Sequence, residues 1–372
     1  MDSPYRRELQ VALAAVERAA TVSQAVLLSS AGRDTAAVEK DDLSPVTAAD
    51  LAVQALLAAS VGQAFPGDVL VGEESAAQLR SHPRLLERVW ELLLPLRRDA
   101  EAGTEFGLPR DRDHLCELLD RCGEGVPGPN GRTWVFDPVD GTKAFVRGEM
   151  YAINVALLSG GRQVVGVAAC PLLSARTGAG DGGSAVCNVS VDPEGRGAVL
   201  FAARGYGAYV RPLFGAGARD AVPRRLGGGD GSARRLRRAV TCVDGLVSGV
   251  DDGVHAAVAA RLGREYPGCD LLGWVPRWAA LALGAADATV WVYGTRDYHA
   301  KVWDHAGAML LFEEAGGLIT DVDGRPIDLA AGRKLKGNFG FVAALKAEHA
   351  EVLVVVQETL RERGLRHLLL EG

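Results

Sequence analysis

Two short apolar runs in this chain are each followed at once by a pair of acidic residues. Residues 69–71 lead through Gly72 into Glu73 and Glu74, and residues 133–136 lead into the sequence Asp-Pro-Val-Asp-Gly-Thr at positions 137–142. Such runs are typical of short buried strands, and the proline and glycine of the second motif favour a turn at the strand end. Carboxylates that meet at strand ends repel one another unless cations hold them, so the pattern favours a fold that builds one acidic site.

Length and composition are those of an ordinary globular protein. The 372 residues suggest two domains or subdomains, and 48% hydrophobic with 24% charged residues excludes a wholly disordered chain. The net charge of −6 offers no excess of positive charge for a nucleic-acid polymer. A small phosphorylated ligand is still compatible with this charge, provided that divalent cations offset some of the carboxylates.

The first residues give no sign of export or of a membrane anchor. They lack the basic-then-apolar layout of a signal peptide, and Glu17 and Arg18 interrupt the apolar stretch at 11–28. The six cysteines include no CxxC pair, which favours reduced structural thiols. The sequence therefore predicts a cytoplasmic protein without membrane contact, and it does not indicate an oligomeric state.

Helix and strand patterns alternate in two blocks, with a break near residues 170–200. Apolar spacing predicts helices at 5–29, 50–64, 83–94, 251–263, 277–283, 303–315 and 346–363, and strands at 69–71, 133–136, 152–158, 164–169, 199–203, 208–211, 288–293 and 318–320. Residues 95–132 are expected to form an inserted loop with a short helical piece at 114–119. The alternation predicts a layered α/β or α+β fold, which we divide into an N-terminal α+β subdomain at 1–172 and a C-terminal α/β subdomain at 173–372.

Six acidic residues stand apart because each lies beside a turn or a helix start in an apolar context: Asp50, Glu73, Glu74, Asp137, Asp140 and Asp304. Any one of them alone is more often a turn residue or a helix cap. A tight turn between Asp137 and Asp140 can aim both carboxylates at one point and adds the Val139 carbonyl. Mg²⁺ prefers oxygen clusters of this kind, and Asp304 lies at an expected helix start, where the helix dipole attracts phosphate. Together these residues predict a magnesium site for a phosphorylated ligand.

In this order the motifs resemble those of the lithium-sensitive, magnesium-dependent phosphomonoesterases, which include inositol monophosphatase and 3'(2'),5'-bisphosphate nucleotidase. The order is Asp50, then Glu73-Glu74, then the motif at 137–142, then Trp303-Asp304 and, after residues 305–315, Gly316-Gly317. The likeness is strongest to the bisphosphate nucleotidases, through residues 44–47, 71–75 and 141–149, and it covers nearly the whole chain. It implies a layered α/β/α/β/α sugar-phosphatase-like fold of two subdomains, with the metals between them, and hydrolysis of a phosphomonoester.

The resemblance also implies roles for single residues. One Mg²⁺ would be held by Glu73, Asp137 and the Val139 carbonyl, and a second by Asp137, Asp140 and Asp304, with two or three ions per site. Asp50 and Thr142 would pair to position and deprotonate the attacking water, without a covalent intermediate. The first subdomain would then carry most metal ligands. Substrate contacts would fall on Gly141, Thr142, Lys143, Arg147, Ser248, Arg277 and Lys301.

Two substrate segments depart from the family pattern. Bisphosphate nucleotidases usually show Ser-Ser-His where this chain has residues 247–250, and Asp-Ser-Gln before Lys-Tyr where it has residues 273–278. Ser248 and the basic character of Arg277 survive. The change adds Trp274 to the second segment, together with Trp278, and these aromatic rings could stack on a base.

Three hypotheses for the function follow. The first is removal of the 3'-phosphate from adenosine 3',5'-bisphosphate to give AMP and phosphate, with the sulfated form of that nucleotide as a further candidate. The second is the same chemistry on an inositol or other small sugar phosphate. The third is a catalytically silent relative that binds a phosphorylated metabolite. The complete carboxylate set argues against the third, because a silent protein has no need of Asp50 and Thr142.

Overall fold

The computed structural model of the chain describes residues 3–30, 45–101, 107–178, 185–227, 239–242, 249 and 253–370. These residues form helices α1 (Arg6–Ser30), α2 (Pro45–Ala64), α3 (Ala77–Ser81), α4 (Pro83–Glu101), α5 (Arg112–Glu124), α6 (Thr142–Val146), α7 (Val254–Arg261), α8 (Trp274–Leu283), α9 (Ala306–Glu314) and α10 (His349–Glu362), with short 3-10 helices η2 (Val302–Asp304) and η3 (Arg366–Leu368). The strands are β1 (Val69–Gly72), β2 (Arg132–Asp140), β3 (Ala152–Ser159), β4 (Arg162–Cys170), β5 (Ala198–Ala203), β6 (Ala208–Pro212), β7 (Arg224–Leu226), β8 (Ala239–Cys242), β9 (Glu265–Asp270), β10 (Ala288–Trp291), β11 (Gly317–Thr320) and β12 (Phe341–Leu345).

The strands form two sheets of different order. The first runs from β1 to β7 in sequence order, and the second has the order β11-β12-β10-β8-β9. In the first sheet β1 and β2 are parallel, and every later pair is antiparallel. Parallel neighbours need a long crossover, which α3, α4 and α5 supply between β1 and β2. The carboxyl ends of β1 and β2 therefore meet at the same edge of the sheet.

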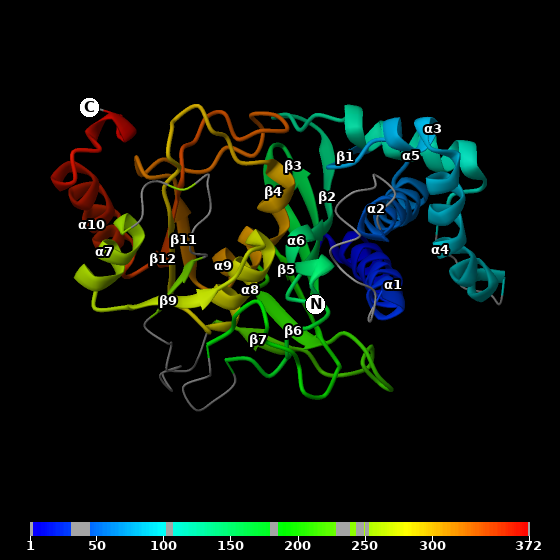
Figure 1. Ribbon diagram of the computed structural model, residues 1–372, viewed down its shortest axis with the longest axis horizontal. Coiled ribbons are helices and arrows are strands. Elements are labelled where there is room, and N and C mark those ends of the chain that lie inside the picture. Colours follow the sequence, from blue (N-terminus) through cyan, green and yellow to red (C-terminus); the bar gives the residue numbers. More distant parts are fainter. Residues whose placement is uncertain are drawn as a thin grey trace.

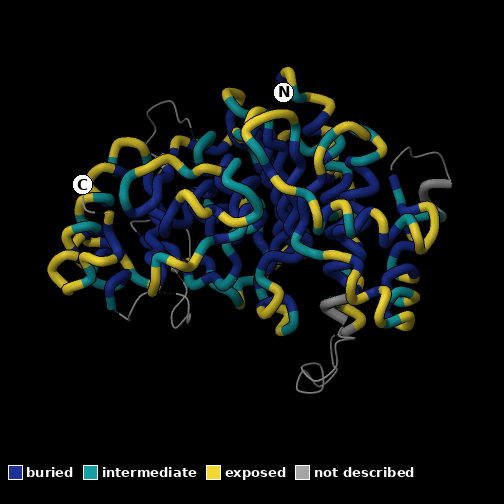
Figure 2. The backbone as a smooth tube through the Cα atoms, turned by 90° about the horizontal axis from the view of Figure 1, so that it is seen from above, coloured by how far each residue is buried: buried dark blue, intermediate teal, exposed yellow. Residues whose placement is uncertain are grey.

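Sheets and helices stack in five layers (Figure 1). Helices α1 and α2 cover one face of the first sheet, α8 and α9 lie between the two sheets, and α7 and α10 cover the outer face of the second. Seen from above, buried backbone fills the middle of the molecule and exposed backbone surrounds it (Figure 2). The order of layers is α/β/α/β/α, so the fold class implied by the motifs is confirmed.

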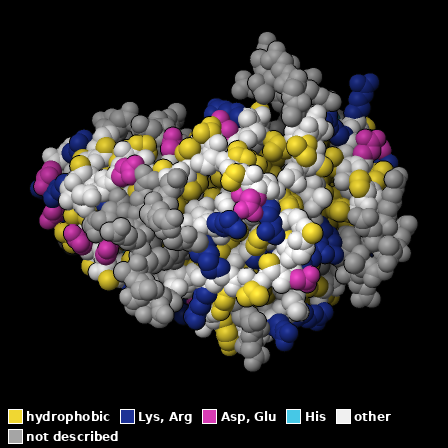
Figure 3. All heavy atoms as spheres, turned by 90° about the horizontal axis from the view of Figure 1, so that it is seen from below, with side chains coloured by type: hydrophobic (Ala, Val, Ile, Leu, Met, Phe, Trp, Pro, Cys, Tyr) yellow, Lys and Arg dark blue, Asp and Glu magenta, His cyan; other side chains and the backbone are white. Residues whose placement is uncertain are grey.

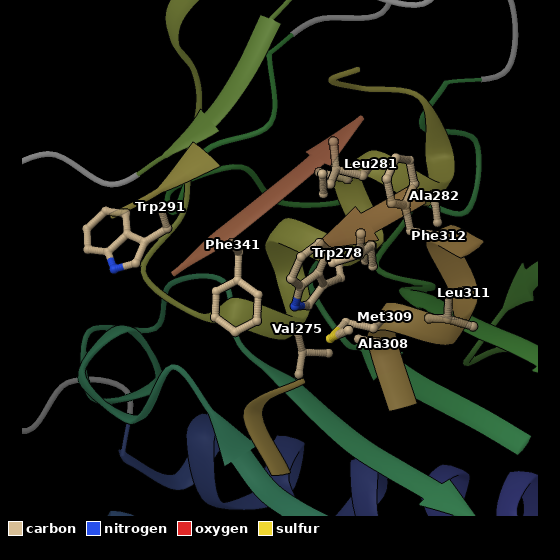
Figure 4. Close-up of a cluster of buried hydrophobic side chains, with 14 of the residues drawn as sticks. Val275, Trp278, Leu281, Ala282, Trp291, Ala308, Met309, Leu311, Phe312 and Phe341 are labelled. Atoms are coloured by element: carbon tan, nitrogen blue, oxygen red, sulfur yellow. The ribbon is translucent and has the colours of Figure 1, made fainter. Parts of the chain in front are cut away.

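The core between the sheets is built around α8 and α9 (Figure 4). Trp278 of α8, Phe312 of α9 and Phe341 of β12 are each at most 1% exposed, and they pack with Met309 and Val275. Side chains of this size each remove a large apolar area from water. The core therefore fixes both helices against both sheets.

Helix α9 approaches the first sheet so closely that two glycines are required. A Cβ on Gly166 of β4 would lie 2.3 Å from the Gly307 carbonyl oxygen. A Cβ on Gly307 of α9 would lie 2.4 Å from Asn154 Oδ1 and 2.5 Å from the Val155 carbonyl oxygen. The Asn154 amide donates to the Trp303 carbonyl at 2.7 Å. These contacts hold the segment before α9 against β3.

Helix α1 is long and apolar enough to span a membrane by length and composition, but half of its apolar window is buried inside the fold. Its Glu17 is 7% exposed and forms ion pairs with Arg211 of β6 and, at 2.8 Å, with Arg219. Helix α1 therefore packs as a core helix of the first layer.

On the face of the molecule shown in Figure 3, Lys and Arg side chains are interspersed with acidic and hydrophobic ones.

The region between β1 and β2 differs from its prediction. Helix α4 continues through Pro95 to Glu101, because Leu93 and Leu96 keep its apolar face buried. Helix α5 occupies thirteen residues of the expected loop and buries one face. The short helical piece expected at 114–119 is thus part of a longer helix, and the expected loop is wrong where α4 and α5 run, since the charges of α5 lie on the outer face of an amphipathic helix. Helix α2 also begins earlier than predicted, at Pro45.

Four strands, β7, β8, β9 and β12, have no counterpart among the predicted elements. Strand β9 contains Pro267 and Gly268, which a strand pattern normally excludes, but it lies at the edge of its sheet, where proline is tolerated. Strand β12 is a run of five apolar residues, which periodicity alone cannot distinguish from a helix.

The first sheet extends beyond the domain boundary expected at residues 172 and 173. Strand β5 pairs with β4, with Cys170 opposite Ala198, and β6 and β7 continue the sheet to Leu226. The change from the first sheet to the second therefore falls between Leu226 and Ala239, while the division into domains remains a prediction.

The contact between α9 and β3 gives a prediction about stability. Gly307→Ala should lower the free energy of unfolding by roughly 1–3 kcal/mol, although alanine favours helix, because the new methyl group overlaps the backbone of β3. Gly67→Ala is the control: no atom lies within 4 Å of its added Cβ, and we expect a change within about 0.5 kcal/mol. Urea unfolding measures both, and an unchanged midpoint for Gly307→Ala would contradict the close approach.

Candidate active site

The parallel pairing of β1 and β2 places acidic residues side by side. Gly72 is opposite Phe136 in this pair, so Glu73 and Asp137 are the next residues on the two strands. Asp137 is 2% exposed, and its Oδ1 has no hydrogen-bond partner among the residues described. The two strand ends thus bring together carboxyl groups that are far apart in the sequence.

Helix α2 holds the turn after β1 through an amide side chain. Gln54 donates to the Glu74 carbonyl at 2.8 Å and accepts from the Glu74 N–H at 2.9 Å. A Cβ on Gly72 would lie 2.5 Å from the Gln54 amide carbon, so glycine is needed there. Asp50 precedes Gln54 by one helical turn on the same face and is 7% exposed. Helix α2 therefore positions both Asp50 and the two glutamates.

The second acidic motif departs from regular strand pairing. The register between β2 and β3 shifts between Asp137 and Asp140, and Gly141 has φ 89°, a conformation that glycine adopts readily. The Val139 carbonyl accepts a hydrogen bond from the Thr142 hydroxyl at 3.1 Å. Asp140, 8% exposed, accepts from the Val275 N–H at the start of α8 at 2.6 Å. The turn therefore aims Asp140 at a helix N-terminus.

Asp304 joins these groups from the second half of the chain. It ends η2, whose Trp303 carbonyl is held by Asn154, the residue opposite Asp137 on β3. The Asp304 and Asp137 carboxyl groups lie close enough for each to affect the pKa of the other. Lys301 also belongs to this cluster, because its Nζ lies 3.0 Å from Glu73 Oε1.

Burial of this cluster favours protonated carboxyl groups. Loss of hydration raises the pKa values of Asp50, Asp137 and Asp304 well above the ordinary range, and repulsion between neighbouring carboxylates adds to the rise. Burial likewise raises the pKa of Asp140 to about 7, although the N–H donors at the start of α8 lower it. Burial also raises the pKa of Glu74 to about 7, and repulsion from Glu73 adds to this rise. The cluster therefore carries more acidic groups than it can ionise unaided.

For the pKa of Lys301, the effect of neighbouring charges outweighs the effect of burial. Burial lowers the pKa of its ammonium group, but Glu73 above all, together with Asp304 and Asp137, raises it by more, so the net shift is upward. The ammonium group therefore stays charged and offsets part of the negative charge of the cluster.

The donor set fits a hard divalent cation by its chemistry. Within the described ranges no three His, Cys, Asp or Glu side chains are already arranged as a metal site. The oxygens are nevertheless all hard donors, Asp137 Oδ1 is unpaired, and the raised pKa values mark a place where positive charge is favourable. The groups that would hold such a cation are the Glu73, Asp137, Asp140 and Asp304 carboxylates and the Val139 carbonyl.

Other predicted site residues follow Asp140 in the chain. Thr142 and Lys143 are exposed at the start of α6, and Arg147 follows its end, 3.9 Å from Glu149. The hydroxyl of Thr142 bonds to the Val139 carbonyl, so its pairing with Asp50 remains a prediction. Ser248 lies outside the described residues.

Arg277 and Trp278 are both 0% exposed. The Arg277 guanidinium donates to the Leu271 carbonyl at 2.7 Å and lies 4.4 Å from the Trp274 ring centre, and the Trp278 indole donates to His305. Tertiary packing therefore encloses both side chains, and contact of either with a ligand remains a prediction.

Gln54 and Asn154 position the site but were missed in the sequence. Each holds a backbone group next to a carboxylate, and neither lies in a motif. The spacing of Gln54 four residues after Asp50 was the available signal, since it places both on one helix face. Asn154 gave none, because its partner Trp303 is 149 residues away.

Known proteins resemble this chain over nearly its whole length. The chain matches the inositol monophosphatase family over residues 8–360. A 3'(2'),5'-bisphosphate nucleotidase of Emericella nidulans is 35% identical over 367 residues, which cover 96% of this chain and 99% of that protein. Its counterpart in Schizosaccharomyces pombe is 32% identical over 357 residues, 94% of each chain.

Solved structures agree on the fold. An inositol monophosphatase of Zymomonas mobilis superposes with a TM-score of 0.55 at 19% identity, over 95% of this chain and 99% of its own. The chain therefore belongs to the inositol monophosphatase family of phosphatases, with relatives named 3'(2'),5'-bisphosphate nucleotidases.

Proposed function

We propose that this chain is a magnesium-dependent phosphatase that removes the 3'-phosphate of adenosine 3',5'-bisphosphate, giving AMP and phosphate, and that also accepts the sulfated form of that nucleotide. The observation that carries the proposal is the buried carboxyl cluster at the paired ends of β1 and β2, completed by Asp304. Relatives at 30–35% identity that bear the nucleotidase name support the choice of substrate.

Glu73, Asp137, Asp140, Asp304 and the Val139 carbonyl would hold two or three Mg²⁺ ions. Bound Mg²⁺ would lower the pKa of a water, neutralise the phosphoryl oxygens and stabilise the leaving alkoxide. By the family resemblance we also propose inhibition by Li⁺.

Asp50 and Thr142 are proposed to handle the proton of the attacking water. Asp50 is buried and its pKa is raised by burial, then by Glu74 and Glu73, so its carboxylate is a stronger proton acceptor than an exposed one. Thr142 is exposed at the start of α6, and its hydroxyl can donate in one direction while accepting in another.

Lys143, Arg147 and Lys301 are the proposed contacts for the second phosphate, together with Gly141. The first two are exposed next to α6, and Lys301 is half-buried beside Glu73. Trp274, which is partly exposed, remains as the aromatic surface of the second segment. Arg277 is proposed as a further contact although it is buried here, and a small sugar phosphate remains the second candidate substrate.

A cytoplasmic location is part of the proposal. The described side chains of Cys116, Cys122, Cys170, Cys187 and Cys269 are free thiols, which suits a reducing compartment.

Substrate choice gives the first test of the function. Purified protein with Mg²⁺ should release phosphate from adenosine 3',5'-bisphosphate with a higher kcat/KM than from inositol 1-phosphate, because the basic residues near α6 favour a ligand with a second anionic group. Phosphate release over a panel of phosphomonoesters measures this. Faster turnover of inositol 1-phosphate would transfer the assignment to the sugar-phosphate alternative, and EDTA should abolish either activity.

Water activation can be separated from metal binding at Thr142. Thr142→Ala should lower kcat by about 10²–10⁴ while KM and the Mg²⁺ requirement stay nearly unchanged, because the hydroxyl acts on the attacking water. Thr142→Ser keeps the hydroxyl and should retain most activity. Steady-state kinetics measure both variants. A normal kcat for the alanine variant would contradict the role in water activation and would show that the Thr142 hydroxyl serves only its hydrogen bond to the Val139 carbonyl.

The raised pKa values predict a pH-dependent effect of Mg²⁺ on stability. Asp140 and Glu74 bind protons in the folded state up to about pH 7, whereas unfolded carboxyls release them near pH 4. Without cations, this stabilisation is complete below pH 4 and is lost as the pH rises through 7. Mg²⁺ replaces these protons, so it should raise the melting temperature more at pH 8 than at pH 5.

The control for this measurement is a surface carboxylate. Asp140→Asn should lose most of the Mg²⁺ effect, whereas Asp220→Asn, at an exposed position between β6 and β7, should keep it. Thermal melts in EDTA and in excess Mg²⁺ compare the proteins, and an equal Mg²⁺ effect at both pH values would contradict the exchange of protons for cations.

A further inference from the structure

Arg333 lies between β11 and β12, and its guanidinium group reaches the first half of the chain. Its Nη2 donates to the Gly72 carbonyl at 2.6 Å, and its Nη1 donates to the Cys122 and Gly125 carbonyls at 2.9 and 3.0 Å. Gly72 ends β1 immediately before Glu73, and the other two carbonyls lie at the C-terminal end of α5. One side chain therefore holds the end of β1 against the end of α5.

The same residue holds η2 on the other side. The Arg333 carbonyl accepts from the Val302 N–H at 3.0 Å, and its guanidinium carbon lies 4.7 Å from the centre of the Trp303 ring. Val302 and Trp303 form η2 together with Asp304. Arg333 is thus in contact with the residues that immediately precede both Glu73 and Asp304.

We propose that Arg333 is a positioning residue that sets the separation of Glu73 and Asp304 and thereby the affinity of the site for its divalent cation. The inference rests on the proposed function, since it concerns the same cation. Arg333 acts through the Gly72 carbonyl and the Trp303 ring, and it donates to neither carboxylate in this structure.

The chemistry of arginine suits this position. Three carbonyls from two elements need a planar fork of donors, which lysine does not have. A cation is favourable at the C-terminal end of α5, and a guanidinium group stacks well on an indole ring. A Cβ on Gly125 would lie 1.8 Å from the Leu70 carbonyl oxygen, so the end of α5 packs directly on β1 where Arg333 joins them.

The experiment compares Arg333→Lys and Arg333→Met with the unmodified chain. Each protein is freed of metal with EDTA and titrated with Mg²⁺ while the melting temperature is recorded. Both variants should need about 10- to 100-fold more Mg²⁺ for half of the maximal increase, because residues that support metal ligands commonly change affinity by this factor. KM for the phosphomonoester at saturating Mg²⁺ should change by less than about threefold.

Arg296→Met is the matched control. Arg296 also lies over an aromatic ring, Phe339 at 4.7 Å, and donates to a backbone carbonyl, that of Leu368 at 2.6 Å. It contacts no residue next to a proposed ligand in the described chain. Its Mg²⁺ titration should match that of the unmodified protein.

The possible results separate the two proposals. An unchanged Mg²⁺ midpoint in Arg333→Lys would overturn the positioning role and leave the function standing, and so would an equal shift in Arg296→Met, since general loosening would then explain both. If Mg²⁺ fails to raise the melting temperature of the unmodified chain, the metal dependence in the proposed function fails as well. Should Arg333→Met not fold, the lysine variant, which keeps the charge, decides the question.

Discussion

The burial of several carboxyl groups at one point is the constraint on which the rest of the structure depends. Each loses hydration and repels its neighbours, so the fold must supply positive charge or donors nearby. It does so with the first N–H groups of α8 at Asp140 and with the Lys301 ammonium group at Glu73. Surroundings that favour a proton on a carboxylate also favour a doubly charged ion in its place, which is why this arrangement suits phosphoryl chemistry.

Local chemistry made much of the acidic site predictable. Pro138 and Gly141 predict an interruption of regular strand pairing, so the approach of Asp137 and Asp140 could be inferred from neighbouring residues, although β2 continues to Asp140 where a turn was expected. The position of Glu73 beside Asp137 could not, because it follows from the parallel pairing of β1 and β2 across a long crossover.

Tertiary packing decided what local chemistry could not. Arg277 reads as a solvent-facing cation, yet aromatic rings and backbone carbonyls enclose it. Helix α5 reads as a charged loop, yet its charges face outward from a buried apolar stripe. A pattern of residue types shows which groups are polar but not which of them the fold covers, so the gathering of the acidic residues was more predictable than the burial of Arg277.

The long sequence separations in the site have a consequence for folding. Asp50 and the two glutamates are close in sequence, as are Asp137 and Asp140, but these two groups meet only after the crossover between β1 and β2 has closed, and Asp304 joins them only after η2 has docked on Asn154 across 149 residues. Closing loops of this length costs chain entropy early, and the contacts that reward it come late. The site is therefore among the last parts of the molecule to form, and an unfolded or half-folded chain offers a cation no complete set of ligands. Cation binding would thus select the finished fold over its precursors and lengthen the lifetime of that fold.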